Sequence, residues 1–265
     1  MRPIFCVISL GRAKGKTALL EWLTEKLTNS GIKIATIKHS TKRFDTEEKD
    51  TWRYLESRAA EVVYVSPWEL ITLRRTTASL ADAIEALHID PDLILVEGFK
   101  DAPYPKILCV GDPRELVEAV ESIQNIVAVT GELDLDGVSN LAIRFMNKEE
   151  VYELLKQAVV DYWLKLIPNF DCGKCSYKSC KELSRAIRGG KATIRECSMR
   201  STSLSRVVVD GVEVPLGTWP QKLLRELLVA FVKSLRLNGV NLDDAEKMSV
   251  EINLRTMKEW GMARG

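Results

Sequence analysis

Histidine and net charge are scarce in this sequence, and long apolar runs do not occur. Only two of the 265 residues are histidine, and the formal net charge is +1. So small a charge gives no reason to expect binding to nucleic acid or to an anionic membrane surface. No stretch approaches the roughly 20 apolar residues that a membrane helix needs. We therefore expect no nucleic-acid partner and no membrane-spanning segment.

The remaining composition is that of an ordinary globular protein, with 46% hydrophobic and 28% charged residues. The N-terminal segment enters a strand pattern within a few residues. It has no basic region, long apolar stretch or cleavage site, so we expect no signal peptide. We expect a cytoplasmic protein, because thiols stay reduced in that compartment and can hold a metal.

Short β-rich runs alternate with helical patterns up to residue 145. Several of these runs are almost continuously apolar, as the buried strands of a parallel sheet are. The alternation predicts an α/β fold, a mostly parallel sheet with helices on both faces and right-handed crossovers. The predicted strands span residues 4–9, 33–38, 62–66, 93–97, 106–110 and 126–130, and the predicted helices span 16–29, 50–60, 79–86 and 113–122.

The rest of the chain is predicted to hold two smaller units. A helix over residues 148–166 leads to a cysteine cluster within 168–200. A hairpin around Asp210-Gly211, an amphipathic helix over 219–237 and an alternating strand over 249–254 then predict a small α+β module. We therefore divide the chain at residues 1–147, 148–200 and 201–265.

A phosphate-binding loop is predicted between the first strand and the first helix. The segment LGRAKGKT matches the second half of the P-loop pattern, with Leu10 at the place of the first glycine. Gly15 lets the backbone approach a phosphate, Lys16 supplies positive charge and Thr17 offers a hydroxyl to magnesium. Gly11, one place late, supplies the turn. The alternative is a glycine turn capped by threonine, and the flanking strand and helix favour the phosphate loop.

Other candidate residues lie where strands end, because ligands of open α/β sheets bind at the carboxyl ends of strands. Glu97 follows four apolar residues and is placed to hold magnesium or to orient a water. Its alternative is a solvated strand-end glutamate. Lys38 and His39 end the second strand. For His39 the alternatives are a substrate contact and a hydrogen-bonded structural role. For Lys38 they are a phosphate contact and a side chain that faces solvent. Asp50, just before a predicted helix, is typical of an N-cap.

Over residues 3–145 the sequence resembles the MobB family of GTP-binding adaptors in molybdopterin-guanine dinucleotide synthesis. The resemblance rests on GKTALLEWL, ATIKHS, EKDTWRYLESRAAE, DLILVEGFK and PKILCV, in that order. It implies a P-loop fold that is often dimeric, binds GTP with Mg²⁺ and hydrolyses GTP weakly. It also implies support for the guanylyltransferase that joins GMP to molybdopterin.

Several site residues follow from this resemblance by position. Leu10 and Lys14 depart from the commoner loop sequence, which bears on the hydrolytic rate more than on binding. The preference for guanine rests wholly on the resemblance, since the sequence has no NKxD-like motif. The family assigns phosphate and metal binding to Gly15, Lys16 and Thr17, the acidic strand end to Glu97, and its second motif to Lys38, His39 and Asp50.

Four cysteines follow the spacing C-x2-C-x4-C-x16-C, and no histidine lies nearby. An all-sulfur metal site is therefore predicted. Zinc is the alternative to iron–sulfur, although zinc ribbons usually bring two C-x2-C pairs and this chain has one. The segment IPNFDCGKCSYKSC, followed by AIRGGKATIREC, resembles the 4Fe-4S domain of corrinoid-protein and electron-transport subunits. The four predicted ligands are Cys172, Cys175, Cys180 and Cys197.

Three functions fit these features. The first is a GTP-binding adaptor with an appended cluster, in which Lys16 and Glu97 assist slow hydrolysis. The second is a nucleotide-driven metallochaperone or cluster carrier. The third is a small-molecule kinase, which needs an arginine-bearing lid that the sequence does not offer. The adaptor is favoured because the resemblance spans the whole N-terminal unit. The expected partners of this adaptor are GTP, molybdopterin or its guanylyltransferase, and a second copy of the chain.

Overall fold

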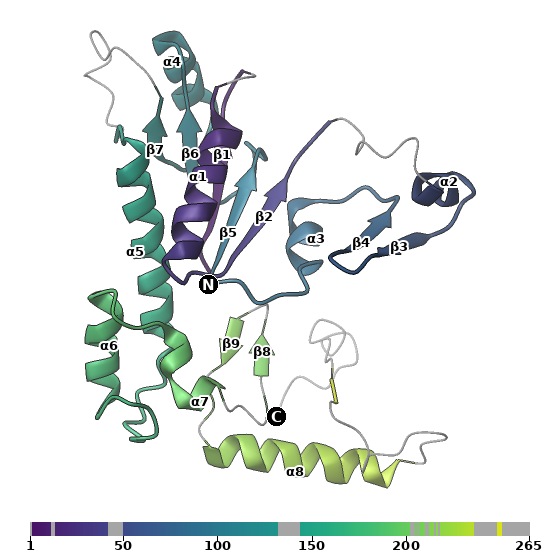
Figure 1. Cartoon of the computed structure of the whole chain (residues 1–265), viewed down its shortest axis with the longest axis vertical. Coiled ribbons are helices and arrows are strands. Elements are labelled where there is room, and N and C mark those ends of the chain that lie inside the picture. The colour runs from purple at the N-terminus through teal and green to yellow at the C-terminus, as the bar shows by residue number, and fades with distance from the viewer. Residues whose placement is uncertain are drawn as a thin grey trace, which may run out of the picture.

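The computed structural model describes residues 2–11, 14–41, 50–131, 144–201, 205, 207–209, 212–214, 216, 218–235 and 248–250. Its centre is a five-stranded parallel sheet with the order β2-β5-β1-β6-β7 (Figure 1). The predicted α/β fold is confirmed, and each of these strands lies within one or two residues of its predicted bounds. The strands are β1 (Ile4–Ile8), β2 (Ile34–Lys38), β5 (Leu93–Glu97), β6 (Lys106–Cys109) and β7 (Ile126–Thr130).

Helices cover both faces of this sheet, as the apolar strands require. Phe5 and Val7 of β1 belong to the core under α1 and α5, whereas Ile4, Cys6 and Ile8 belong to the core under α3 and α4. This division follows from the alternation of side chains along a strand. The helices are α1 (Lys16–Asn29), α3 (Leu80–Glu85), α4 (Pro113–Ser122) and α5 (Lys148–Leu166).

The strand predicted over residues 62–66 is confirmed as a strand, but its expected place in the parallel sheet is wrong. It is β3 (Glu61–Val65), which pairs antiparallel with β4 (Leu70–Arg74), a strand that the sequence analysis missed. Val62 is the one buried residue of β3, so the strand lacks the two apolar faces of a central position. With the helix α2 (Asp50–Glu56), β3 and β4 form an arm beside the sheet (Figure 1).

The C-terminal part begins with α6 (Cys180–Arg188), the 3-10 helix η1 (Ile194–Glu196) and α7 (Ser198–Ser201). The predicted hairpin is confirmed as β8 (Val207–Val209) and β9 (Val212–Val214), and its turn at 210–211 lies outside the described residues. The predicted amphipathic helix is α8 (Thr218–Ser234). Of the strand predicted over 249–254, residues 249–250 are described and are not a strand.

One hydrophobic core runs from the sheet into the C-terminal part. Leu23 of α1 and Leu155 of α5 belong to the same cluster as Leu183 and Ile187 of α6 and Ile194 of η1. The division of the chain at residues 147 and 200 stays a prediction. Among the described helices, none combines the length and the apolar character needed to cross a bilayer.

Candidate nucleotide site and cysteine cluster

The predicted phosphate loop lies between β1 and α1, at the carboxyl edge of the parallel sheet (Figure 1). Gly15 is the N-cap of α1 and has a φ of 76°, in the left-handed region. An added Cβ there would meet no atom within 4 Å, so the backbone conformation, and not space, requires glycine. Because Gly15 has no side chain to cap the helix, the first N–H groups of α1 can serve an anion.

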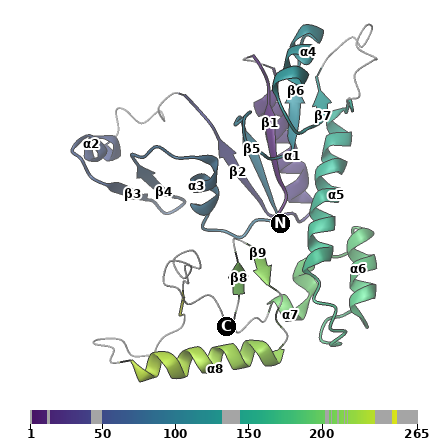
Figure 2. The same cartoon turned by 180° about the vertical axis from the view of Figure 1, so that it is seen from behind.

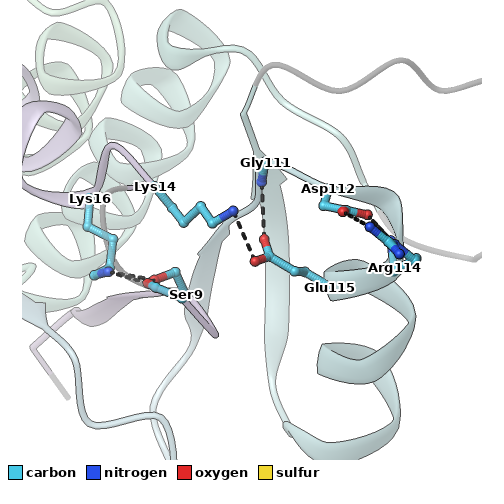
Figure 3. Close-up of polar contacts among 8 residues, drawn as sticks. Ser9, Lys14, Lys16, Gly111, Asp112, Arg114 and Glu115 are labelled. Atoms are coloured by element: carbon cyan, nitrogen blue, oxygen red, sulfur yellow. Dashed lines mark hydrogen bonds and ion pairs between the residues drawn. The ribbon is translucent and has the colours of Figure 1, made fainter.

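The Lys16 side chain turns back across its own loop. Its Nζ donates to the Ser9 hydroxyl and lies 3.3 Å from the Gly11 carbonyl oxygen, and the Ser9 hydroxyl donates to that same carbonyl at 2.5 Å (Figure 3). These contacts join the end of β1 and Gly11 to the lysine amine at the start of α1. Sequence reasoning missed Ser9, which looked like the last residue of the strand.

Three candidate residues from three different elements meet beside this loop. The Thr17 hydroxyl donates to Glu97 Oε1 at 3.3 Å, and Lys38 Nζ lies 3.5 Å from Glu97 Oε2. The cause is the strand register, which pairs Lys38 with Glu97 and Val7 with Glu97 across adjacent parallel strands. A hydroxyl and a carboxylate at this distance form part of the oxygen donor set that magnesium takes.

His39 lies at the same edge, where it makes a backbone hydrogen bond and an aromatic contact. Its backbone N–H donates to the Glu97 carbonyl at 2.9 Å, and its ring centroid lies 4.4 Å from that of Phe99. Gly98 has a φ of +95°, and a Cβ there would come within 3.0 Å of His39 Cβ. The turn Glu97-Gly98-Phe99 therefore packs around the His39 side chain. This packing favours a structural role for His39 over a substrate contact.

Asp50 is not brought to the phosphate loop. It begins α2 in the arm, where its carboxylate lies 3.4 Å from Arg53 Nη1 on the same helix. Both views of the chain place α2 beyond β3 and β4, apart from β1 and α1 (Figure 1, Figure 2). The loop that joins β2 to α2, residues 42–49, lies outside the described residues.

A second basic residue of the loop also has a partner that the sequence analysis did not anticipate. Lys14 Nζ lies 3.0 Å from Glu115 Oε1 in the first turn of α4 (Figure 3). The next carboxylate, Asp112, accepts from Arg114, which lowers the Asp112 pKa to about 2. The one sequence feature that pointed to this contact is Lys14 itself, because it departs from the commoner loop sequence.

The cysteine cluster occupies the turns around α6 and η1. Cys172 is exposed, Cys175 and Cys180 are half-buried and Cys197 is buried. Cys180 begins α6, with Ser179 as the N-cap. The structure joins none of the described cysteines in a disulfide.

Three hydrogen bonds tie the cysteine-bearing segments together. Asp171 Oδ1 accepts from the Cys180 N–H at 2.6 Å, which links the first and third cysteines. The Ser198 hydroxyl donates to the Lys174 carbonyl at 2.7 Å, beside the second and fourth. Tyr177 Oη donates to Glu196 at 2.9 Å, one residue before Cys197.

This arrangement fits an all-sulfur metal group in its donor set and in the proximity of the segments. In the described part of the chain, no three His, Cys, Asp or Glu side chains converge on one point. Four thiols without a nearby histidine suit iron–sulfur or zinc. By contrast, burial raises the pKa of Cys6 and of Cys109 to about 11, which disfavours the thiolate that a metal needs.

The cluster and the phosphate loop lie at opposite edges of the sheet. Arg195, two residues before Cys197, forms an ion pair with Asp92 and donates to the Gly31 carbonyl at 2.9 Å. Asp92 lies immediately before β5, at the amino edge of the sheet. The figures show the same separation: α6 lies beside the end of α5 that is farther from the phosphate loop (Figure 1, Figure 2).

Two segments of the chain match known families. Residues 4–132 match the family described as "Molybdopterin guanine dinucleotide synthesis protein B", or MobB. Residues 167–199, which contain the four clustered cysteines, match the family described as "Putative Fe-S cluster". The two matches correspond to the two regions whose geometry is given above.

Individual proteins also match. A Methanocaldococcus jannaschii protein named "Putative molybdopterin-guanine dinucleotide biosynthesis adapter protein" is 25% identical over 252 residues, which are 92% of this chain and 95% of that protein. The crystal structure of Bacillus subtilis MobB covers 59% of this chain and 97% of its own, with a TM-score of 0.49 and 22% identity. The Bacillus subtilis (strain 168) protein named "Probable molybdopterin-guanine dinucleotide biosynthesis adapter protein" is 34% identical over 133 residues, which are 48% of this chain and 75% of that protein. The chain therefore belongs to the MobB family.

Proposed function

We propose that this chain is a GTP-binding adaptor in molybdopterin-guanine dinucleotide biosynthesis, with slow GTP hydrolysis and an appended iron–sulfur cluster. The observation that carries the proposal is the contact between Thr17 and Glu97 at the carboxyl edge of the sheet, next to Lys16 in the loop, in a chain that belongs to the MobB family. The names of the relatives support the pathway, and the preference for guanine rests on the family.

The loop residues take distinct roles in this proposal. The backbone around Gly11 and Gly15 wraps the phosphates, and Lys16 neutralises their charge. Thr17 and Glu97 hold Mg²⁺, and Glu97 also orients the attacking water during slow hydrolysis. Lys38 is held near Glu97, where it can meet a phosphate oxygen; His39 shapes the neighbouring turn.

We assign the cluster to Cys172, Cys175, Cys180 and Cys197, with zinc as the competing metal. An iron–sulfur cluster supplies one-electron chemistry when bound. The chain's own contribution is to bring the four thiols onto segments joined by hydrogen bonds and to bury Cys197. The site lies at the amino edge of the sheet, so direct contact between nucleotide and cluster is not part of the proposal; this separation speaks against hydrolysis-gated metal release.

We also propose that the chain forms a homodimer through its arm. Three large apolar side chains of the β3–β4 hairpin are mostly exposed: Val65 at 68%, Trp68 at 91% and Leu70 at 65%. Large apolar side chains that are exposed together are typical of a protein interface. Sedimentation velocity on the wild type and on Trp68→Ser tests this: a dimer that persists at equal strength in Trp68→Ser excludes the hairpin tip as the contact.

Lys16→Ala tests the nucleotide site. We expect GTP affinity to fall on the order of 100-fold, because charge-assisted hydrogen bonds to phosphate are lost. Calorimetric titration with GTP and Mg²⁺ measures the affinity, and iron content measures the cluster in the same preparation. The matched control is Lys33→Ala at the amino edge of the sheet, which should bind GTP normally. Equal GTP binding by Lys16→Ala and wild type would refute the phosphate loop.

A further inference from the structure

Lys14 links the proposed phosphate loop to the start of α4. Its Nζ lies 3.0 Å from Glu115 Oε1, and the two side chains are 26% and 23% exposed. An ion pair this far removed from water interacts more strongly than a surface pair. The phosphate loop therefore carries a second cation beside Lys16, and a carboxylate from another element neutralises it.

Two glycines make room for this lysine. A Cβ at Gly11 would lie 3.1 Å from Lys14 Cε, and a Cβ at Gly111 would lie 3.3 Å from Lys14 Cδ and Nζ (Figure 3). The lysine stem thus passes between the loop and the turn that joins β6 to α4. Its direction toward Glu115 is set by the backbone on both sides.

Glu115 is the carboxylate of this group that can release Lys14. The neighbouring Asp112 is already engaged by Arg114 at 2.8 Å. Glu115 Oε2 lies 3.4 Å from the Gly111 N–H, and Glu115 stands in the first turn of α4, where the helix dipole favours a negative charge. If Lys14 leaves, the carboxylate keeps these two sources of stabilisation.

We propose that Glu115 competes with the nucleotide phosphates for Lys14. This inference rests on the proposed nucleotide site. Lys14 directly precedes Gly15 in the loop, and its flexible four-carbon stem can turn from α4 toward a bound phosphate. Exchange of Glu115 for phosphate adds a second positive charge to the one that Lys16 supplies. Glu115 then acts through Lys14: it lowers nucleotide affinity and makes binding depend on the charge of the phosphate chain.

The test uses the 265-residue chain and five variants: Glu115→Gln, Lys14→Gln, the double variant, Glu118→Gln and, as the probe of the nucleotide site itself, Lys16→Ala. Glutamine at 115 can still accept from the Gly111 N–H, so the local structure is kept. Glu118→Gln removes the same charge one turn further along α4 and leaves the Lys14–Glu115 pair in place. Calorimetry measures binding of a non-hydrolysable GTP analogue with Mg²⁺, of GDP and of guanosine.

We expect Glu115→Gln to bind the triphosphate about 5-fold more tightly and Lys14→Gln to bind it about 10-fold more weakly. The double variant should bind like Lys14→Gln, because Glu115 has nothing to compete for without the lysine. Guanosine binding should not change in any variant, and Glu118→Gln should behave as wild type.

The contrary results are equally distinct. Weaker or unchanged triphosphate binding by Glu115→Gln, while Lys16→Ala loses binding, overturns the competition and leaves the nucleotide site standing. Tighter binding by Glu118→Gln to the same degree reduces the effect to general charge and also overturns it. If Lys16→Ala binds the GTP analogue as tightly as wild type, the nucleotide site itself is refuted. Melting curves of each variant confirm that affinities are compared between folded proteins, and Lys14→Gln gives a second, independent measurement should Glu115→Gln fail to fold.

Discussion

Strand β5 has an acidic residue at each end, and the two residues differ in their surroundings. Glu97 ends the strand at the carboxyl edge of the sheet, where Thr17 and Lys38 lie 3.3 and 3.5 Å from its oxygens. Asp92 precedes the strand at the amino edge and is only 8% exposed. The contacts of Glu97 are long and come from side chains that can move, so this carboxylate can exchange a partner for a ligand.

Asp92 has instead a set of close donors. The Lys33 N–H and the Trp163 Nε1–H each donate at 2.8 Å, and Arg195 adds its guanidinium. These donors come from the residue before β2, from α5 and from η1 in the cysteine module, residues 167–199. A buried carboxylate whose partners are all supplied by the fold holds elements together and has little capacity for a ligand. The same side-chain chemistry therefore serves binding at one edge and assembly at the other.

The strongest test of this separation removes a proposed metal ligand at the amino edge. Cys175→Ser should lose the metal of the cysteine module, while GTP affinity stays within about 2-fold of wild type, because the two sites lie at opposite edges of the sheet. Metal analysis after anaerobic purification should give about four irons per wild-type chain, with a broad absorption band that dithionite bleaches. One zinc and no colour would identify a structural zinc site.

Cys6→Ala provides the control for this experiment. Cys6 is fully buried in β1, and burial raises its pKa to about 11, so it is a poor source of thiolate. The variant should keep all of its iron. Full metal retention in Cys175→Ser would refute the assignment of the cluster, and a parallel loss of GTP binding would show that the two edges are coupled.

The sequence predicts the parallel sheet well because its strands are apolar on both faces and its helices are long and regular. It misplaces β3 and misses β4, because short β-branched runs fit an edge, a hairpin or a central strand equally well. The position of a strand in a sheet depends on what covers it, and Val62 alone of β3 is buried. That information lies in tertiary contacts.

The candidate site shows the same limit. Lys16, Thr17 and Glu97 can be found because each stands at a fixed distance from a strand that the pattern reveals. Glu115 cannot be found in this way, since its relation to Lys14 arises only when α4 packs beside the loop. Asp92 was missed because it follows Pro91 and resembles an ordinary turn residue, although the fold buries it among three donors.

Alanine substitution of the acidic residue at each end of β5 should have a smaller effect, measured as the free energy of unfolding. Asp92→Ala leaves the Lys33 N–H and the Trp163 indole N–H without their acceptor and removes the partner of Arg195, so we expect a loss of about 3 kcal/mol in the free energy of unfolding. Glu97→Ala should cost less than about 1 kcal/mol, because its contacts are longer and less buried. Urea unfolding of both variants measures the difference.

The ligand-binding side of this comparison should show the reverse order. Glu97→Ala should lose the Mg²⁺ dependence of GTP binding, whereas Asp92→Ala should keep it as long as the protein is folded. Trp163→Phe retains the packing of the ring and removes one of the three donors to Asp92, so it should cost only about 1 kcal/mol. The division of the sheet into a binding edge and an assembly edge requires each carboxylate to matter for one property and not for the other. If Asp92→Ala and Glu97→Ala were equally destabilising, or bound GTP equally poorly, this division would be wrong.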